Sequence, residues 1–185
     1  MTAFTRRNML SGAAATAATA VSSVTLPEPA AADAAEAMEL FVTLSAAITG
    51  IEPTTLAPAV DPVQIKRQYF AQASTDAAFS QLLKITKDAP SPAAAAEQVM
   101  NNPDPAIKYL GRSIILAWYT GCWYSPATLQ SQPPVNPDTV ISAAAYTQGW
   151  MWRVGQAHPM GYSEWRFGYW AADPPPLDAF IGKHA

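Results

Sequence analysis

The sequence predicts an all-α fold, in which a small domain of about five to six helices is followed by a long irregular C-terminal arm. Apolar residues recur at spacings of three and four between about residues 34 and 155, as they do on one face of a helix. Strand-like alternation is nearly absent, and proline-rich stretches separate the helical segments. These observations divide the chain into a leader over residues 1–32, a helical domain over residues 33–157 and the arm over residues 158–185.

The leader has the order of an export signal. Arg6 and Arg7 are followed by a mildly apolar, alanine-rich run from Gly12 to Leu26, and then by small residues around Ala32. A basic start, an apolar middle and a small-residue end are typical of a secretory signal peptide, and the paired arginines resemble the twin-arginine signal. The run is too short and too rich in Ala, Thr and Ser to span about 30 Å of hydrocarbon. We therefore expect export by the twin-arginine translocase, with processing near Ala32.

The first two helices flank a proline-rich turn region over residues 52–62. The first helix is predicted over Ala34–Thr49 with Gly50 at its cap, and the residues at helical spacing are Met38, Phe41, Val42, Ser45 and Ile48. The second helix is predicted to begin with Asp61 as N-cap and Pro62 at the first helical position, and to run through residue 70.

Two shorter helices are expected next. The third starts at Ser74-Thr75-Asp76 and carries Phe79, Leu82, Leu83 and Ile85. Pro90-Ser91-Pro92 ends it. The fourth covers Ala93 to Met100, and its helical preference comes from alanine rather than from a strong apolar face.

The fifth helix, from Ala106 to about Cys122, is predicted to be the longest and most hydrophobic, with Asp104-Pro105 at its start. Its inward-facing residues are Ile107, Leu110, Ile114, Ala117, Trp118 and Gly121, and Leu116 and Tyr119 widen the apolar stripe. A polar, proline-rich loop over Ser125 to Pro137 follows. Pro137-Asp138 then leads into a sixth helix, whose residues at helical spacing are Val140, Ala144, Gln148, Met151 and Trp152.

The arm gathers aromatic residues on a segment that glycine and proline keep irregular. The stretch from His158 to Trp170 carries Tyr162, Trp165, Phe167, Tyr169 and Trp170. Large aromatic side chains carry much of the binding energy at protein interfaces, because each buries a large area at low entropic cost. The arm therefore either lies on another protein through these five residues or closes the chain's own core.

No catalytic, cofactor-binding or metal-binding residue is predicted. The sequence contains no G-x-G-x-x-G for a dinucleotide, no C-x-x-C-H for haem and no cysteine spacing for an iron–sulfur cluster. His158 has no partner at a metal-ligand spacing, and Ser163 lacks the G-x-S-x-G context of a nucleophile. We expect His158 to bond the backbone of its own loop and His184, next to the C-terminus, to be solvated.

Charge and cysteine usage limit the partners. The formal net charge of −3 comes with no basic cluster, which argues against nucleic acid. Only 14% of the residues are charged, so part of the surface is expected to be covered in use. Cys122, the single cysteine, is predicted to be a buried thiol, with a bond to a partner chain as the alternative. Arg153 and Arg166 flank the aromatic residues, and each either anchors a partner's carboxylate or has a helix-end or surface role.

The export signal and the missing cofactor motifs together indicate that a second protein is exported with this chain. The twin-arginine route carries proteins that are already folded, usually because a cofactor is inserted in the cytoplasm. A chain with this signal but without a cofactor site is expected to escort a partner that folds in the cytoplasm and leaves attached to it.

Several motifs together resemble a known family. They are Phe41-Val42-Thr43-Leu44-Ser45 with Ile48-Thr49-Gly50, Ala117-Trp118-Tyr119-Thr120-Gly121, Tyr146 with Trp150-Met151-Trp152, His158-Pro-Met-Gly-Tyr162 and Phe167-Gly-Tyr-Trp-Ala171. In order and spacing they look like the small subunit of membrane-bound, FAD-dependent sugar and polyol dehydrogenases. That group includes the sorbitol, fructose, glucose and gluconate enzymes, and the likeness spans nearly the whole mature chain and the leader.

The resemblance implies a three-part complex in the periplasm, peripherally associated with the inner membrane. A large flavoprotein subunit holds FAD and the catalytic residues, and a multihaem cytochrome c subunit passes electrons to membrane quinone. The small subunit binds no cofactor; it assists maturation of the flavoprotein, carries it through the twin-arginine route and stays bound to it. The aromatic arm would then lie along the large subunit.

One position departs from the family pattern. Family members often have a cysteine just after the Gly-Tyr of the arm, where it can cross-link to the large subunit, and here that position is Ser163. The resemblance therefore does not carry the covalent link to this chain, and Cys122 lies elsewhere. The alternative to the subunit hypothesis is a stand-alone periplasmic binding or structural protein, or a small enzyme.

Overall fold

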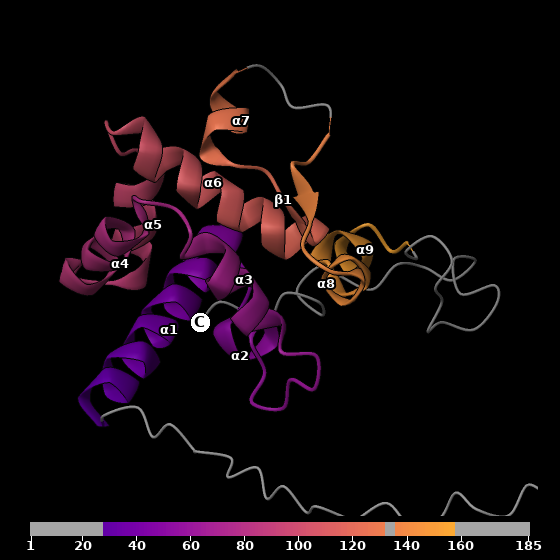
Figure 1. Ribbon diagram of the computed structural model, residues 1–185, viewed down its shortest axis with the longest axis horizontal. Coiled ribbons are helices and arrows are strands. Elements are labelled where there is room, and N and C mark those ends of the chain that lie inside the picture. Colours follow the sequence, from indigo (N-terminus) through magenta and orange to yellow (C-terminus); the bar gives the residue numbers. More distant parts are fainter. Residues whose placement is uncertain (1–27, 132–135, 158–185) are drawn as a thin grey trace, which may run out of the picture.

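The computed structural model, which describes residues 28–131 and 136–157, confirms the all-α class. Two long helices, α1 (Glu28–Thr49) and α6 (Pro105–Thr120), pack against each other in the middle of the molecule, and the shorter helices surround them (Figure 1). The shorter helices are α2 (Pro53–Leu56), α3 (Ile65–Ala73), α4 (Phe79–Asp88), α5 (Pro92–Met100), α7 (Pro126–Ser131), α8 (Ala143–Gln148) and α9 (Trp150–Val154). The leader up to residue 27 and the arm lie outside the described residues.

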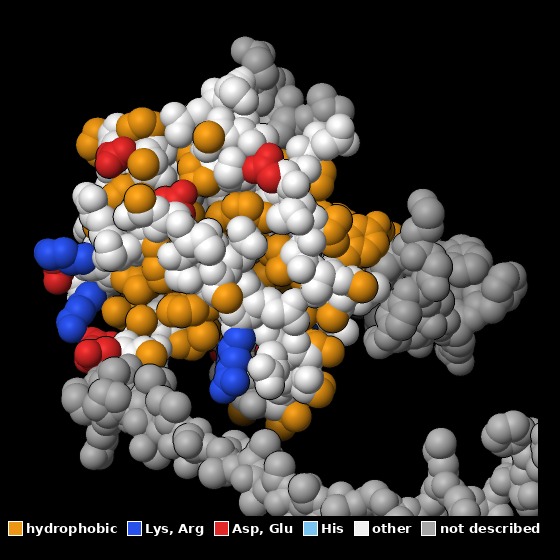
Figure 2. Space-filling view, in the orientation of Figure 1, with side chains coloured by type: hydrophobic (Ala, Val, Ile, Leu, Met, Phe, Trp, Pro, Cys, Tyr) orange, Lys and Arg blue, Asp and Glu red, His pale blue; other side chains and the backbone are white. Residues whose placement is uncertain are grey.

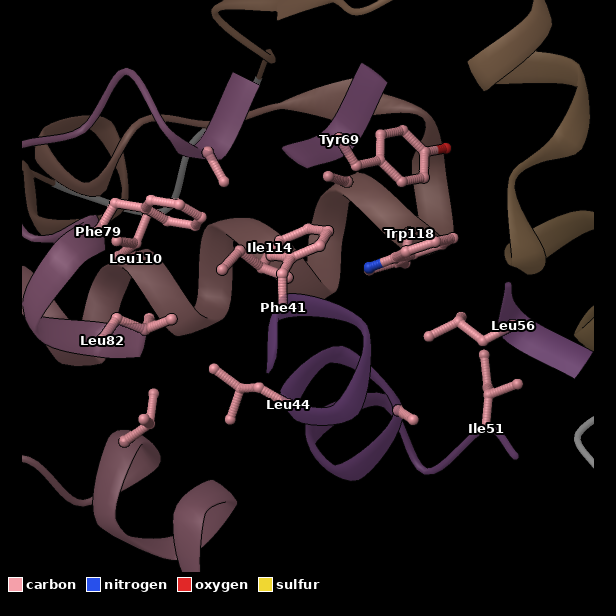
Figure 3. Packing of buried hydrophobic residues seen from close by; sticks show 14 of the residues in the cluster. Phe41, Leu44, Ile51, Leu56, Tyr69, Phe79, Leu82, Leu110, Ile114 and Trp118 are labelled. Carbon is pink, nitrogen blue, oxygen red and sulfur yellow. The ribbon is translucent and has the colours of Figure 1, made fainter. Parts of the chain in front are cut away.

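The core lies between α1, α3, α4, α5 and α6, and aromatic rings fill its centre. Phe41 on α1 contacts the rings of Phe70, Phe79 and Trp118, with centroids 5.6, 6.1 and 6.5 Å away. Tyr69 meets Trp118 edge to face at 4.6 Å. Figure 3 shows Trp118 between these rings on one side and Leu56 and Ile51 on the other. Offset and edge-to-face pairs of this kind stabilise a core beyond the area they bury.

The apolar face predicted for the α6 region is confirmed. All six residues expected to point inward are buried, and Leu116 and Tyr119 are partly buried. The Asp104 carboxylate accepts a hydrogen bond from the Ala106 N–H at 2.9 Å, with Pro105 in the first turn, so the predicted cap is present as well.

Two expectations about the long helices are wrong. The longest helix is α1, with 22 residues against 16 for α6, because the alanine-rich stretch before Ala34 continues the helix back to Glu28. Helix α6 ends at Thr120 rather than near Cys122, because Gly121 adopts a left-handed conformation with φ of 68° and caps it.

The predicted start of the second helix is also wrong. Helix α3 begins at Ile65, because Gln64 has a φ of 54° and this left-handed residue interrupts the helical path from Pro62. The Asp61 carboxylate accepts a long hydrogen bond, 3.4 Å, from the Lys66 N–H, so it lies near the helix start without being its N-cap. The proline-rich turn region contains the short helix α2, which Glu52 caps through the Thr55 N–H.

The sixth predicted helix is replaced by a strand and two short helices. Strand β2 (Thr139–Val140) pairs antiparallel with β1 (Cys122–Trp123), in the register Cys122 with Val140 and Trp123 with Thr139. Both β2 residues are β-branched, which favours extended backbone over helix. The helical part is then split into α8 and α9 at Gly149, whose ψ of 133° is extended.

The loop predicted over 125–137 contains α7. The side chain of Asp138, just after the loop, bonds back to the loop's first residues. The Asp138 carboxylate accepts hydrogen bonds from the Ser125 N–H at 2.7 Å and from the Thr128 hydroxyl at 2.6 Å. These bonds lower the pKa of the Asp138 carboxyl, with the Thr128 hydroxyl as the largest cause. The ionised carboxylate therefore fixes where β2 begins.

Candidate functional site

The residues predicted to act directly on partners lie outside the described residues. They are Arg6 and Arg7 in the leader and Tyr162, Trp165, Phe167, Tyr169 and Trp170 in the arm. The structure describes the base from which the arm starts. After α9 the chain makes a left-handed turn at Gln156, with φ of 49°, and the Ala157 N–H donates to the Trp152 carbonyl at 2.8 Å. This cap ends α9 and fixes the backbone up to Ala157, the last residue before the arm.

Three of the family-like motifs meet at this base. The C-terminal ends of α1 and α6 lie together there with α8 and α9, and we call this region the junction. The Tyr119 hydroxyl on α6 donates to the Thr49 carbonyl at the end of α1, at 3.1 Å. The Tyr69 hydroxyl on α3 donates to the Ala145 carbonyl on α8 at 3.4 Å. Burial raises the pKa of the Tyr69 phenol well above its ordinary value, so this donor keeps its proton.

Two glycines allow the backbones of the junction to approach closely. A Cβ added to Gly121 would lie 2.3 Å from the carbonyl carbon and oxygen of Ala145. A Cβ added to Gly149 would lie 2.7 Å from the Tyr119 carbonyl oxygen. Only residues without a side chain fit at such distances. The helix end Ala117–Gly121 is therefore needed to seat α8 and α9 against α6.

The aromatic residues of α8 and α9 hold this short segment together. The Trp152 indole N–H donates to the Tyr146 carbonyl at 2.7 Å, and the two rings meet edge to face at 5.3 Å. Trp150 is buried, with 5% of its surface exposed. Helices of five and six residues are not stable alone, so these contacts and the glycines keep the arm's base in one conformation.

A surface pocket of about 200 Å³ lies beside the junction, between the segment from α2 to α3 and the end of the chain's described part. We call it the junction pocket. Its apolar lining includes Trp118, Trp150 and Leu56, and Val60 and Val63 lie at its edge with 83% and 38% of their surfaces exposed. Its polar lining includes Gln148, Asp61 and Arg153.

Arg153 is the cation of this pocket. Its guanidinium carbon lies 4.8 Å from the centroid of the Trp150 ring, in a cation–π arrangement. Among the described residues it forms no ion pair, although Asp61 lines the same pocket. The N–H groups on the outer edge of the guanidinium are therefore available to donate hydrogen bonds to an acceptor on another molecule.

The pocket is suited to contact rather than to catalysis. Small-molecule sites usually have volumes of about 300–1,000 Å³, and this pocket is smaller. Among the described residues, its lining contains no histidine, cysteine or serine, and the hydroxyl of its Thr55 donates to the Glu52 carboxylate. The size and chemistry of the junction pocket fit one bulky apolar side chain that has a polar group next to it.

Charged side chains gather at the other end of the molecule. Lys87 pairs with Glu36 at 2.8 Å and Lys84 with Asp88 at 2.6 Å, so both ion pairs join or lie on α1 and α4. Figure 2 shows charged side chains near that end, while the part of the same face over α8 and α9 is hydrophobic or neutral.

Cys122 is buried, as predicted, and forms no disulfide among the described residues. Its Sγ donates weakly to the Thr120 carbonyl at 3.6 Å. In the part of the chain that the structure describes, no three His, Cys, Asp or Glu residues group in a way that could hold a metal ion. No helix within residues 28–131 or 136–157 combines the length and apolar character needed to cross a bilayer.

Sequence reasoning missed the junction pocket. Its walls come from segments nearly a hundred residues apart, and α2, the Gln64 conformation and the break at Gly149 were all needed to form it. The available signal was the pair Val60 and Val63, two branched apolar residues in a proline-rich turn where polar residues are common.

A family model described as membrane-bound FAD-containing D-sorbitol dehydrogenase matches residues 4–174 of the chain. The match takes in the twin arginines, all of the described fold and most of the arm. No curated protein and no solved structure matches the chain.

The FAD in the family's description does not fit the described residues. A dinucleotide is typically held at the end of a parallel sheet, by a glycine-rich turn that leads into a helix. The described residues contain one antiparallel ribbon of two-residue strands. The junction pocket is also too small for a dinucleotide. The described residues thus lack the parallel sheet and glycine-rich turn that typically hold a dinucleotide.

Proposed function

Since this chain belongs to the family of membrane-bound FAD-containing D-sorbitol dehydrogenases, we propose that it is the non-catalytic small subunit of an FAD-dependent sugar or polyol dehydrogenase complex. One observation carries the proposal. The family match covers the whole described fold, yet the only sheet of these residues is a two-stranded ribbon, unlike the parallel sheet that typically holds a dinucleotide. FAD and the sugar-oxidising residues then belong to another chain, the flavoprotein subunit.

The same proposal assigns the other members of the complex. A multihaem cytochrome c subunit takes electrons from the flavoprotein and delivers them to membrane quinone. The complex faces the periplasm and is peripherally associated with the inner membrane. The small subunit contributes neither FAD nor haem, and its part is to bind and stabilise the flavoprotein.

The small subunit also escorts the flavoprotein during export. Arg6 and Arg7 supply the twin-arginine signal, which accepts folded cargo. A flavoprotein that has folded around FAD in the cytoplasm can leave only with a chain that carries such a signal. The junction supports the binding half of this role, because it fixes the base of the aromatic arm and leaves an apolar surface beside it. Tyr162, Trp165, Phe167, Tyr169 and Trp170 are proposed to lie on the flavoprotein.

Co-expression of this chain with its flavoprotein subunit tests the proposal. With the natural leader, we expect FAD absorbance and sugar-dependent dye reduction in the periplasmic fraction. The double change Arg6→Lys and Arg7→Lys should retain both proteins in the cytoplasm, still active and still bound to each other. Arg112→Lys, an equally conservative change at an exposed arginine of α6, should leave export unchanged.

Two results would contradict the proposal. One is export of the flavoprotein in cells that lack this chain. The other is a periplasmic chain that purifies as a monomer without flavin when the flavoprotein is present.

A further inference from the structure

The junction pocket carries an inference that rests on the proposed function and deepens it. We propose that this pocket receives a bulky apolar side chain of the flavoprotein subunit, and that Arg153 binds a carboxylate next to that side chain. The pocket thus forms a second contact with the flavoprotein, made by the folded domain itself and separate from the aromatic arm.

The exposed valines are the first observation. Val60, Val63 and Val140 are the large hydrophobic residues that are exposed among the described residues, and two of the three lie at this pocket. Val60 keeps 83% of its surface in water beside the buried rings of Trp118 and Trp150. Apolar groups gathered around a concave apolar floor are typical of a protein-binding site.

Arg153 is the second observation, and Arg112 provides a comparison. Both guanidinium groups stack on an aromatic ring, at 4.8 Å over Trp150 and at 4.9 Å over Tyr109, and neither forms an ion pair among the described residues. Stacking occupies the face of the guanidinium and leaves its edge available for a bidentate carboxylate. Arg153 combines this arrangement with a pocket lined by Trp118, Trp150 and Val60.

The occupant follows from size, charge and position. The volume of about 200 Å³ accepts one large side chain rather than a helix or a dinucleotide. The unpaired cation at the edge selects a segment with a carboxylate. Arg153 lies on α9, which ends four residues before the arm begins, so a partner held by the arm is close to the pocket. We assign this occupant to the flavoprotein subunit, because it is the partner that the proposed function places on the neighbouring arm.

Affinity measurements with the purified flavoprotein and the full-length chain test this contact. Val60→Asp and Arg153→Glu should each weaken binding at least about tenfold. The matched controls are Val140→Asp, an exposed valine on β2, and Arg112→Glu, the other stacked arginine, and each should change binding by less than about twofold. Circular dichroism should show that all four variants remain folded, because each changed side chain is exposed.

A photo-crosslink identifies the occupant directly. A benzophenone amino acid in place of Val60 should cross-link the native complex to a flavoprotein peptide that contains Asp or Glu, and the same probe in place of Val140 should not. A cross-link from position 60 to residues 158–185 of the same chain would overturn the inference, because the arm would then fill the pocket.

The outcomes separate the inference from the proposed function. If the unchanged chain binds no flavoprotein, both fail. If it binds and the Val60 and Arg153 variants bind as tightly as their controls, the inference alone is overturned and the proposed function stands.

Discussion

The two ends of the molecule differ in the side chains that they expose and in how closely their backbones pack. At the end formed by α4 and the first half of α1, Leu82 is fully buried beneath a surface that carries the ion pairs of Lys84 and Lys87. At the junction, backbones touch through Gly121 and Gly149, and the surface beside them leaves Val60 in water. The first end therefore exposes charged side chains to solvent and buries its apolar ones. The second is rigid inside and apolar outside, which is the combination that a preorganised binding surface needs.

The largest effect that would break this comparison is expected from Gly121→Ala. A Cβ in the left-handed conformation costs about 1–2 kcal/mol, and overlap with the Ala145 backbone adds about 1–3 kcal/mol. We expect the free energy of unfolding to fall by about 3 kcal/mol, measured by urea denaturation. Gly50→Ala is the control, because Gly50 has a similar φ of 72° but open space around its Cβ position. Equal losses at the two glycines would show that the junction is not tightly packed.

The charged end should lose stability without losing the partner. Leu82→Ala removes a fully buried side chain of α4, and such changes cost about 2–5 kcal/mol. We expect a clear fall in the midpoint of thermal unfolding, while the affinity of the folded chain for the flavoprotein stays within about twofold. A loss of affinity as large as that caused by Arg153→Glu would mean that the two ends are not independent.

A smaller effect is expected where α1 and α6 join. Tyr119→Phe removes the hydroxyl that donates to the Thr49 carbonyl, at a cost of about 1 kcal/mol in the free energy of unfolding. Tyr109→Phe is the matched control on the same helix, because its ring still accepts the Arg112 guanidinium. Urea denaturation of both variants would sharpen the comparison. If Tyr119→Phe matches its control, the hydroxyl does not help to hold the junction.

The smallest effect depends on pH. The folded pKa of Asp138 lies below its ordinary value of 3.8, so its contribution to stability is present above that value and is lost as pH falls through the lowered pKa. Because the carboxylate is exposed, the contribution should be below about 1 kcal/mol. The stability difference between the unchanged chain and Asp138→Asn should therefore shrink from about pH 6 to about pH 3. A difference that stays constant would show that ionisation of Asp138 does not hold the loop.

The sequence was sufficient for the parts of the fold that rest on local signals. Asp104-Pro105 and the spacing from Ile107 to Trp118 predict α6 because a cap and an apolar stripe are both encoded within one helix. The burial of Cys122 could be predicted from its aromatic neighbours.

The predictions from sequence were wrong where contacts between distant segments determine the backbone conformation. Val140 fits a helical spacing, but it pairs with Cys122 across the two-stranded ribbon. The residues near Val140 in the sequence do not predict this pairing. The left-handed Gln64 moves the start of α3 although Asp61-Pro62 is a good start signal. The candidate site follows the same rule. The aromatic arm could be identified from composition, whereas the junction pocket needs Trp118 and Val60 to be brought together by the fold.

Cys122 is the only cysteine of the chain, and it is buried. The described fold therefore contains no bond whose formation depends on an oxidant, and its one thiol is shielded from disulfide exchange. A glutathione-rich cytoplasm and an oxidising compartment leave it chemically the same. Folding of the described domain therefore needs no thiol chemistry in either compartment, which fits the proposed export of a chain that is already folded.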